Sequence, residues 1–75
     1  MTELDAQILD LESRRWKYEG AKTAAMVELG LTAPRYYQRL MVLLDDPEAE
    51  AVAPGLVRRL RRLRDARRRV RTPVL

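Results

Sequence analysis

The stretch of the chain that decides the fold reads KTAAMVELGLTAPRYYQRL and runs from Lys22 to Leu40. Its first half is rich in helix-forming residues and stops at Gly30, a residue type that ends helices because it readily adopts positive φ. Thr32 can then cap a second helix, and Pro34 is tolerated in the first turn of that helix. Two short helices joined by a glycine turn are what a helix-turn-helix requires. The pattern therefore predicts a helix-turn-helix at about residues 21–44.

The second helix of this motif would enter the major groove of DNA with its N-terminal end first. Tyr36, four residues after Thr32, is expected to pack inward. We expect the outward side chains to address the major groove or its edges, and these are Thr32, Arg35, Tyr37, Gln38 and Arg39. Met26 fits poorly, because a small residue usually stands four positions before the turn glycine. A plain helical bundle, in which Gly30 only ends a helix, stays open as the alternative.

Another helix is expected before the motif. Thr2 with Asp5 three residues later resembles a helix cap supported by an acidic side chain. Apolar residues then recur at helical spacing to about Tyr18, and Gly20 is expected to end the helix. We expect Trp16 and Tyr18 to pack in the core, because the chain has only four aromatic residues and no phenylalanine.

A long basic helix is expected at about residues 54–71. Before it, the proline of Asp45-Asp46-Pro47 ends the motif, and residues 47–52 are expected to add one or two helical turns. Leucines at helical spacing follow one side of the long helix. Arginine fills most of its other positions, and we expect these arginines to hold the DNA backbone: Arg58, Arg59, Arg61, Arg62, Arg64, Arg67, Arg68, Arg69 and Arg71.

Charge is divided unevenly along the chain. Residues 1–53 carry six basic and ten acidic side chains, a net charge of −4, whereas residues 54–75 carry nine arginines and one acid, a net charge of +8. So many like charges on one helix repel one another unless a polyanion compensates them. Arginine also has the planar fork that matches phosphates and guanine edges. We therefore expect double-stranded DNA as the partner, with internal neutralisation by Asp5, Asp10 and Glu12 as the competing explanation.

Composition argues against several classes of function. The chain is 75 residues long and has neither cysteine nor histidine, so it lacks disulfides, thiolate metal sites and the usual general base. We expect no enzyme, no cofactor and no bound metal. The first five residues include two acids and no basic side chain, unlike a secretory signal, and no apolar run approaches the length of a membrane span. The expected location is the cytoplasm, at the nucleoid.

Six blocks of sequence occur in a distinctive order along the chain. They are Arg15-Trp16-Lys17-Tyr18, Gly20-Ala21-Lys22, Gly30-Leu31-Thr32, Arg35-Tyr36-Tyr37-Gln38, Asp46-Pro47-Glu48-Ala49 and the run from Leu56 to Arg64. Together they resemble a family of short actinobacterial proteins catalogued as a domain of unknown function. At least some members of that family are described as nucleoid-associated proteins that bind DNA. The resemblance covers about residues 5–68 and implies a chromatin-organising or regulatory role, but it carries no set of binding residues.

The expected architecture is all-α, a single compact four-helix domain over residues 1–75 with a central helix-turn-helix and a basic C-terminal helix. DNA binding should be weakly sequence-selective, because one short recognition helix offers few base contacts. A homodimer stays open, although no heptad pattern requires one. The alternative function is a protein-interaction module whose arginine helix meets an acidic surface of a transcription or replication protein. A membrane-surface role ranks third, because the arginine helix lacks aromatic anchors.

Overall fold

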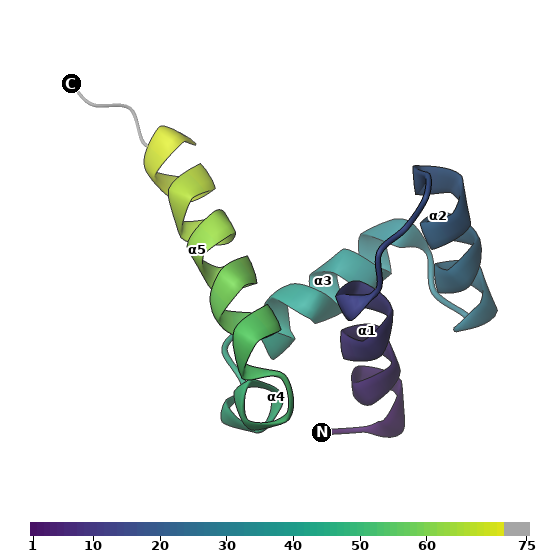
Figure 1. The fold of residues 1–75 in the computed structure, drawn as a ribbon, viewed down its shortest axis with the longest axis horizontal. Coiled ribbons are helices and arrows are strands. Elements are labelled where there is room, and N and C mark those ends of the chain that lie inside the picture. Colours follow the sequence, from purple (N-terminus) through teal and green to yellow (C-terminus); the bar gives the residue numbers. More distant parts are fainter. Residues whose placement is uncertain (72–75) are drawn as a thin grey trace.

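The described part of the chain is all-helical in a computed structural model (Figure 1). The structure describes the backbone of residues 1–71 and the side chains of residues 1–68. The helices are α1 (Glu3–Ser13), α2 (Glu19–Glu28), α3 (Ala33–Leu43), α4 (Pro47–Val52) and α5 (Pro54–Arg71). The expected all-α fold is confirmed. The described residues form five helices rather than four, because residues 47–52 make a helix of their own that Asp46 caps.

The start of α1 follows the sequence pattern. The Thr2 hydroxyl accepts a hydrogen bond from the Asp5 backbone N–H, and the Asp5 carboxylate accepts one from the Thr2 N–H, both at 3.1 Å. This reciprocal arrangement is a capping box, which satisfies donors that the first turn leaves without helical partners.

The end of α1 differs from the expectation. The helix stops at Ser13 instead of about Tyr18, and Gly20 lies in the first turn of α2 instead of ending α1. The Trp16 indole N–H folds back and donates to the Leu11 carbonyl at 3.0 Å, and the same carbonyl accepts from the Arg14 N–H at the end of the helix. Trp16 packs against the core, as expected. Tyr18 does not, because it now lies in the linker before α2, with 66% of its surface exposed.

The turn between α2 and α3 has the expected conformation. Gly30 has φ of +80°. The Leu31 N–H donates to the Met26 carbonyl at 3.1 Å, and the Gly30 N–H donates to the Val27 carbonyl at 2.9 Å. This pair of bonds is the Schellman arrangement that ends a helix at a left-handed residue. Thr32 then caps α3, as the sequence predicts.

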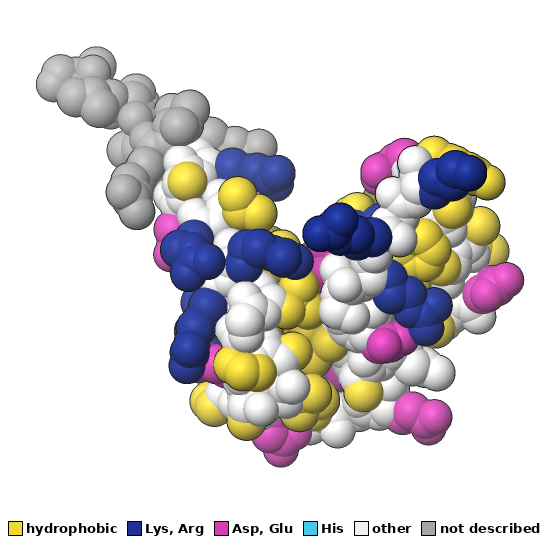
Figure 2. All heavy atoms as spheres, viewed as in Figure 1, with side chains coloured by type: hydrophobic (Ala, Val, Ile, Leu, Met, Phe, Trp, Pro, Cys, Tyr) yellow, Lys and Arg dark blue, Asp and Glu magenta, His cyan; other side chains and the backbone are white. Residues whose placement is uncertain are grey.

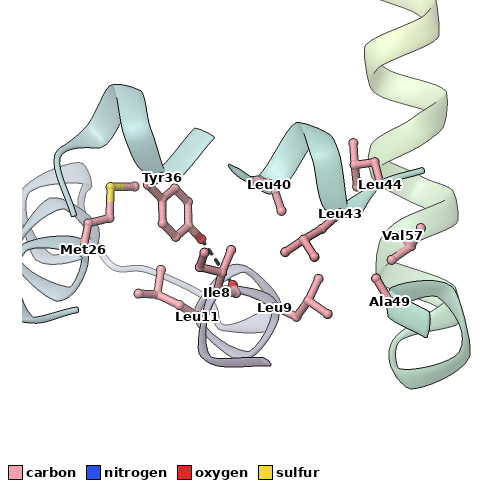
Figure 3. Packing of buried hydrophobic residues seen from close by; sticks show 10 residues of the cluster. All are labelled: Ile8, Leu9, Leu11, Met26, Tyr36, Leu40, Leu43, Leu44, Ala49 and Val57. Carbon is pink, nitrogen blue, oxygen red and sulfur yellow. Dashed lines mark hydrogen bonds between the residues drawn. The ribbon is translucent and has the colours of Figure 1, made fainter. Parts of the chain in front are cut away.

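The core joins all five helices (Figure 3). Its buried members are Ile8, Leu9, Leu11, Met26, Tyr36, Leu40, Leu43, Leu44, Ala49 and Val57. Met26, which looked too large for its position, is the buried residue of α2. Its unbranched side chain can fill an irregular gap in the core, so it anchors α2 where a small residue was expected. Tyr36 is fully buried, as predicted.

α5 leans away from the other helices (Figure 1). Its first turns pack against α4, and α3 packs against both α1 and α2. The later turns of α5 extend beyond the rest of the described chain, so much of this arginine-rich helix is open to solvent. None of the described helices combines the length and the apolar character that crossing a bilayer needs.

Candidate nucleic-acid interface

The described arginines of α5 fall into different positions around the helix. Val57 is fully buried and Leu60 packs against the core, which defines the inner side of α5. Arg61 lies on or beside that inner side and is partly buried, as is Arg64 one turn later. At 100° per residue, Arg59 and Arg62 point to the opposite side, where both are exposed.

Arg61 is engaged at the junction of α3, α4 and α5. Its Nε donates to the Leu44 carbonyl at the end of α3, and its Nη1 lies 3.3 Å from Oε1 of Glu50. Arg58 reaches the same Glu50 oxygen at 3.4 Å. Arg61 therefore ties the helices together and has little capacity left for an external phosphate.

Arg64 is also engaged within the protein. Its Nη1 lies 3.0 Å from Asp45, and its Nε lies 3.3 Å from Asp65. The hydrogen bond between Arg64 and Asp45 lowers the pKa of Asp45 and raises the pKa of Arg64. Arg61 and Arg64, both predicted to bind phosphates, thus have internal partners in the structure.

The carboxylates of α1 have other partners. Asp5 binds Arg39 on α3, Asp10 lies 2.6 Å from Arg14, and Glu12 lies 2.8 Å from Lys22. The competing explanation from sequence, in which these three acids neutralise the arginine helix, therefore named the wrong residues. Arg58, Arg61 and Arg64 of α5 instead pair with Asp45, Glu50 and Asp65, which are three carboxylates for a helix with seven arginines whose side chains are described.

The remaining arginines of α5 leave a basic outer surface. Arg59, Arg62 and Arg67 are exposed and have no ion-pair or hydrogen-bond partner within the part of the chain that the structure describes. Arg68 is also exposed, but it interacts with another group and is not counted among these free arginines. The side chains of Arg69 and Arg71, which the sequence analysis also included, lie outside the described residues.

Two of the five residues predicted on α3 have structural roles. The Thr32 hydroxyl caps the helix by accepting from the Arg35 N–H at 3.4 Å. Arg39 donates two hydrogen bonds to the Asp5 carboxylate, both 2.7 Å long. The Arg39 guanidinium holds the pKa of Asp5 well below its usual range, although burial alone would raise it. Sequence analysis missed this pair, because its members stand 34 positions apart.

The other three residues lie on different sides of α3. The Tyr37 ring stands edge-on to the Tyr36 ring, with centroids 5.1 Å apart, and the Lys22 ammonium lies 5.3 Å from its centre. The side chains of Arg35 and Gln38 are exposed and have no polar partner within the described residues. Of the five predicted residues, only Arg35 and Gln38 thus have side chains without partners in the described structure, and the Tyr37 ring lies beside Lys22 of α2.

A polar network that sequence analysis did not identify lies beside Tyr37. The Tyr36 hydroxyl donates to Glu12 at 2.8 Å, and Lys22 Nζ contacts the same carboxylate oxygen at 2.8 Å. Burial raises the pKa of Tyr36, and the adjacent Glu12 raises it further. Burial alone would lower the pKa of Lys22, but Glu12 and Tyr37 together outweigh burial and raise it. The sequence does place Glu12 on the same side of α1 as Ile8, four residues earlier. This spacing alone does not show which residues of α2 and α3 bind Glu12.

A groove of about 670 Å³ separates α5 from the helices around α3. Figure 2 shows hydrophobic side chains in this cleft, with basic side chains on both flanks. The apolar lining residues are Leu40, Met41, Leu60 and Leu63, and the cationic ones are Lys22, Arg64, Arg67 and Arg68. Tyr37 also lines the groove, whereas Arg35 and Gln38 do not.

Residues 1–72 match the model of a protein family described as a protein of unknown function, DUF3263. The chain belongs to this family. No match emerges among characterised proteins or among solved structures. The match confirms that the chain belongs to a family of unknown function. That members of this family bind DNA stays a prediction.

This member of DUF3263 offers two surfaces of different chemistry. The outer side of α5 presents the exposed guanidinium groups of Arg59 and Arg62, and such groups can contact phosphates. The groove between α3 and α5 combines leucine and methionine side chains with cations. These surfaces suit different partners and need separate tests.

Proposed function

We propose that the protein binds double-stranded DNA, with the outer arginines of α5 on the phosphate backbone. The observation that carries this proposal is the pair Arg59 and Arg62, exposed and without an acidic partner in the described structure. Nearby carboxylates are already bound to Arg58, Arg61 and Arg64. A phosphate oxygen is the ligand that a planar guanidinium fork matches best outside the protein.

The segment from α2 to α3 supplies the second part of the proposal. Here α2, the Gly30 turn and α3 act as a helix-turn-helix, and Arg35 and Gln38 near the start of α3 face the groove of DNA. Two free side chains can distinguish few bases, so binding is weakly selective. A role at the nucleoid, in organising or regulating DNA, fits such binding.

The test measures how binding to a labelled duplex depends on salt, by fluorescence anisotropy at several salt concentrations. We expect micromolar or tighter binding at low salt that weakens steeply as salt rises. The double variant Arg59→Gln/Arg62→Gln should make the slope of log affinity against log salt shallower by about 2, because each phosphate contact contributes about 0.9.

The matched control is Arg15→Gln/Lys17→Gln. It removes the same charge from exposed residues without partners in the linker between α1 and α2, and we expect it to leave the slope nearly unchanged. Absence of binding at low salt would overturn the proposal. Equal losses in both double variants would show that overall charge, and not the outer side of α5, attracts the DNA.

A further inference from the structure

The groove between α3 and α5 leaves apolar side chains without partners. Leu63 is 50% exposed and Met41 is 39% exposed, and both line the groove beside the better-covered Leu40 and Leu60. Adjacent exposed apolar groups rimmed by polar residues are typical of interaction sites in small proteins. Leu63 continues the leucine row of α5 after Leu56 and Leu60, which pack against the core.

The charges around the groove narrow the choice of occupant. Lys22 and Arg64 line it with carboxylate partners, since Lys22 binds Glu12 and Arg64 binds Asp45 and Asp65. Arg67 lines it as an exposed cation without a partner among the described residues. DNA would gain little here, because phosphates would be brought against leucine and methionine. A second copy in a symmetric pair would set this surface against itself and bring arginines against arginines.

We propose that this groove binds an acidic amphipathic helix of another protein. Such a helix would place apolar side chains at i, i+3, i+4 and i+7 against Met41, Leu60 and Leu63. Its acidic side chains would meet Arg67 at the rim, because Arg64 already binds Asp45 and Asp65. Met41 suits this role, because its flexible thioether side chain adapts to different apolar partners. The site differs from that of Arg59 and Arg62, neither of which lines the groove.

The experiment uses a labelled synthetic peptide that forms a helix, with leucines at i, i+3, i+4 and i+7 and glutamates at the flanking positions. A scrambled peptide of the same composition is the reference. We expect saturable binding of the patterned peptide that is about tenfold weaker for Met41→Gln/Leu63→Gln, because truncated apolar anchors dominate such interfaces. Arg67→Gln should weaken binding less and reduce its salt dependence.

The matched control is Val27→Gln/Val42→Gln, which alters exposed apolar residues that do not line the groove. It should bind the peptide as well as the unmodified protein does, and so should Arg59→Gln/Arg62→Gln. Equal binding of patterned and scrambled peptides would overturn the proposal, as would peptide binding that Met41→Gln/Leu63→Gln leaves intact. Displacement of the peptide by duplex would assign the groove to DNA. Self-association that Leu63→Gln abolishes would assign it to a second copy.

Discussion

Asp5 shows how one side chain can serve two structural purposes. It completes the capping box of α1 and also accepts two hydrogen bonds from Arg39 on α3. Its side chain is only 1% exposed, so an ionised carboxylate there depends on these partners. The same pair withdraws Arg39 from the surface that would contact DNA.

Replacing Asp5 with asparagine should destabilise the protein strongly. We expect Asp5→Asn to lower the free energy of unfolding by about 2–3 kcal/mol, since removing one partner of a buried ion pair leaves the other uncompensated. The loss stays below that of a fully buried pair, because the Arg39 side chain is 43% exposed and can be rehydrated. Urea unfolding followed by circular dichroism measures it.

The control for this substitution is Asp10→Asn. Asp10 also pairs with an arginine, Arg14, but both side chains are more than 60% exposed. Exposed pairs stabilise proteins by about 0.5 kcal/mol or less. Similar losses of stability for Asp5→Asn and Asp10→Asn would show that the Asp5 pair stabilises the protein no more than an exposed pair does.

At the scale of elements, the junction of α2 and α3 depends on one backbone conformation. Gly30 has positive φ, which places the Leu31 and Gly30 N–H groups on the last carbonyls of α2. Side-chain space is not the constraint, because nothing lies within 4 Å of where a Cβ would stand. The direction of α3 relative to α2 is therefore set by the backbone at this glycine.

Gly30→Ala should lower the free energy of unfolding by about 1–2 kcal/mol, the usual cost of a left-handed conformation for a residue with a Cβ. Gly55→Ala is the matched control, because Gly55 lies within α5, has open space around it and does not have positive φ. Alanine favours helix there, so its stability should stay the same or rise slightly. Thermal unfolding compares the two, and equal effects would contradict a strained left-handed turn.

Local signals explain why the sequence predicts some elements well. The caps at Thr2 and Thr32 and the stop at Gly30 use atoms only a few residues apart, so the pattern contains the whole interaction. The end of α1 was predicted wrongly because Tyr18 continues the apolar spacing. The side-chain bond from Trp16 to Leu11 requires the chain to leave the helix, and periodicity does not register such a bond.

The candidate site was harder to predict for a physical reason. Arg35 and Arg39 look alike in sequence, as two cations on the same helix. Packing of α1 against α3 brings Asp5 to Arg39 and leaves Arg35 exposed. The arginines of α5 divide in the same way, because contacts at the end of α3 engage Arg61 and Arg64. Charge patterns predict a basic surface, but tertiary contacts decide which cations remain free.

On the scale of the whole molecule, two ion pairs hold parts of the chain that are distant in sequence. Asp5 with Arg39 joins α1 to α3, and Asp45 with Arg64 joins the end of α3 to α5. In both pairs the arginine lowers the pKa of the carboxylate. The arrangement of the helices is therefore linked to the ionisation of two aspartates.

This linkage predicts how stability depends on pH. Both aspartates have lower pKa values folded than unfolded, so the unfolded chain takes up protons first as pH falls. The stabilisation is fully present above about pH 5 and is lost progressively as pH falls through the ordinary carboxylate range toward the lowered values. The midpoint of urea unfolding should stay level from about pH 7 to about pH 5 and then fall steeply.

Salt and one variant separate the two contributions. The Asp45 side chain is 66% exposed, so added salt should screen its share. The buried Asp5 pair should be screened much less, so most of the acid sensitivity should persist at high salt. Asp5→Asn removes the titrating group and should flatten the pH dependence that remains in salt. A midpoint that did not change between about pH 6 and about pH 3 would contradict the linkage, and so would an unaltered pH dependence in Asp5→Asn.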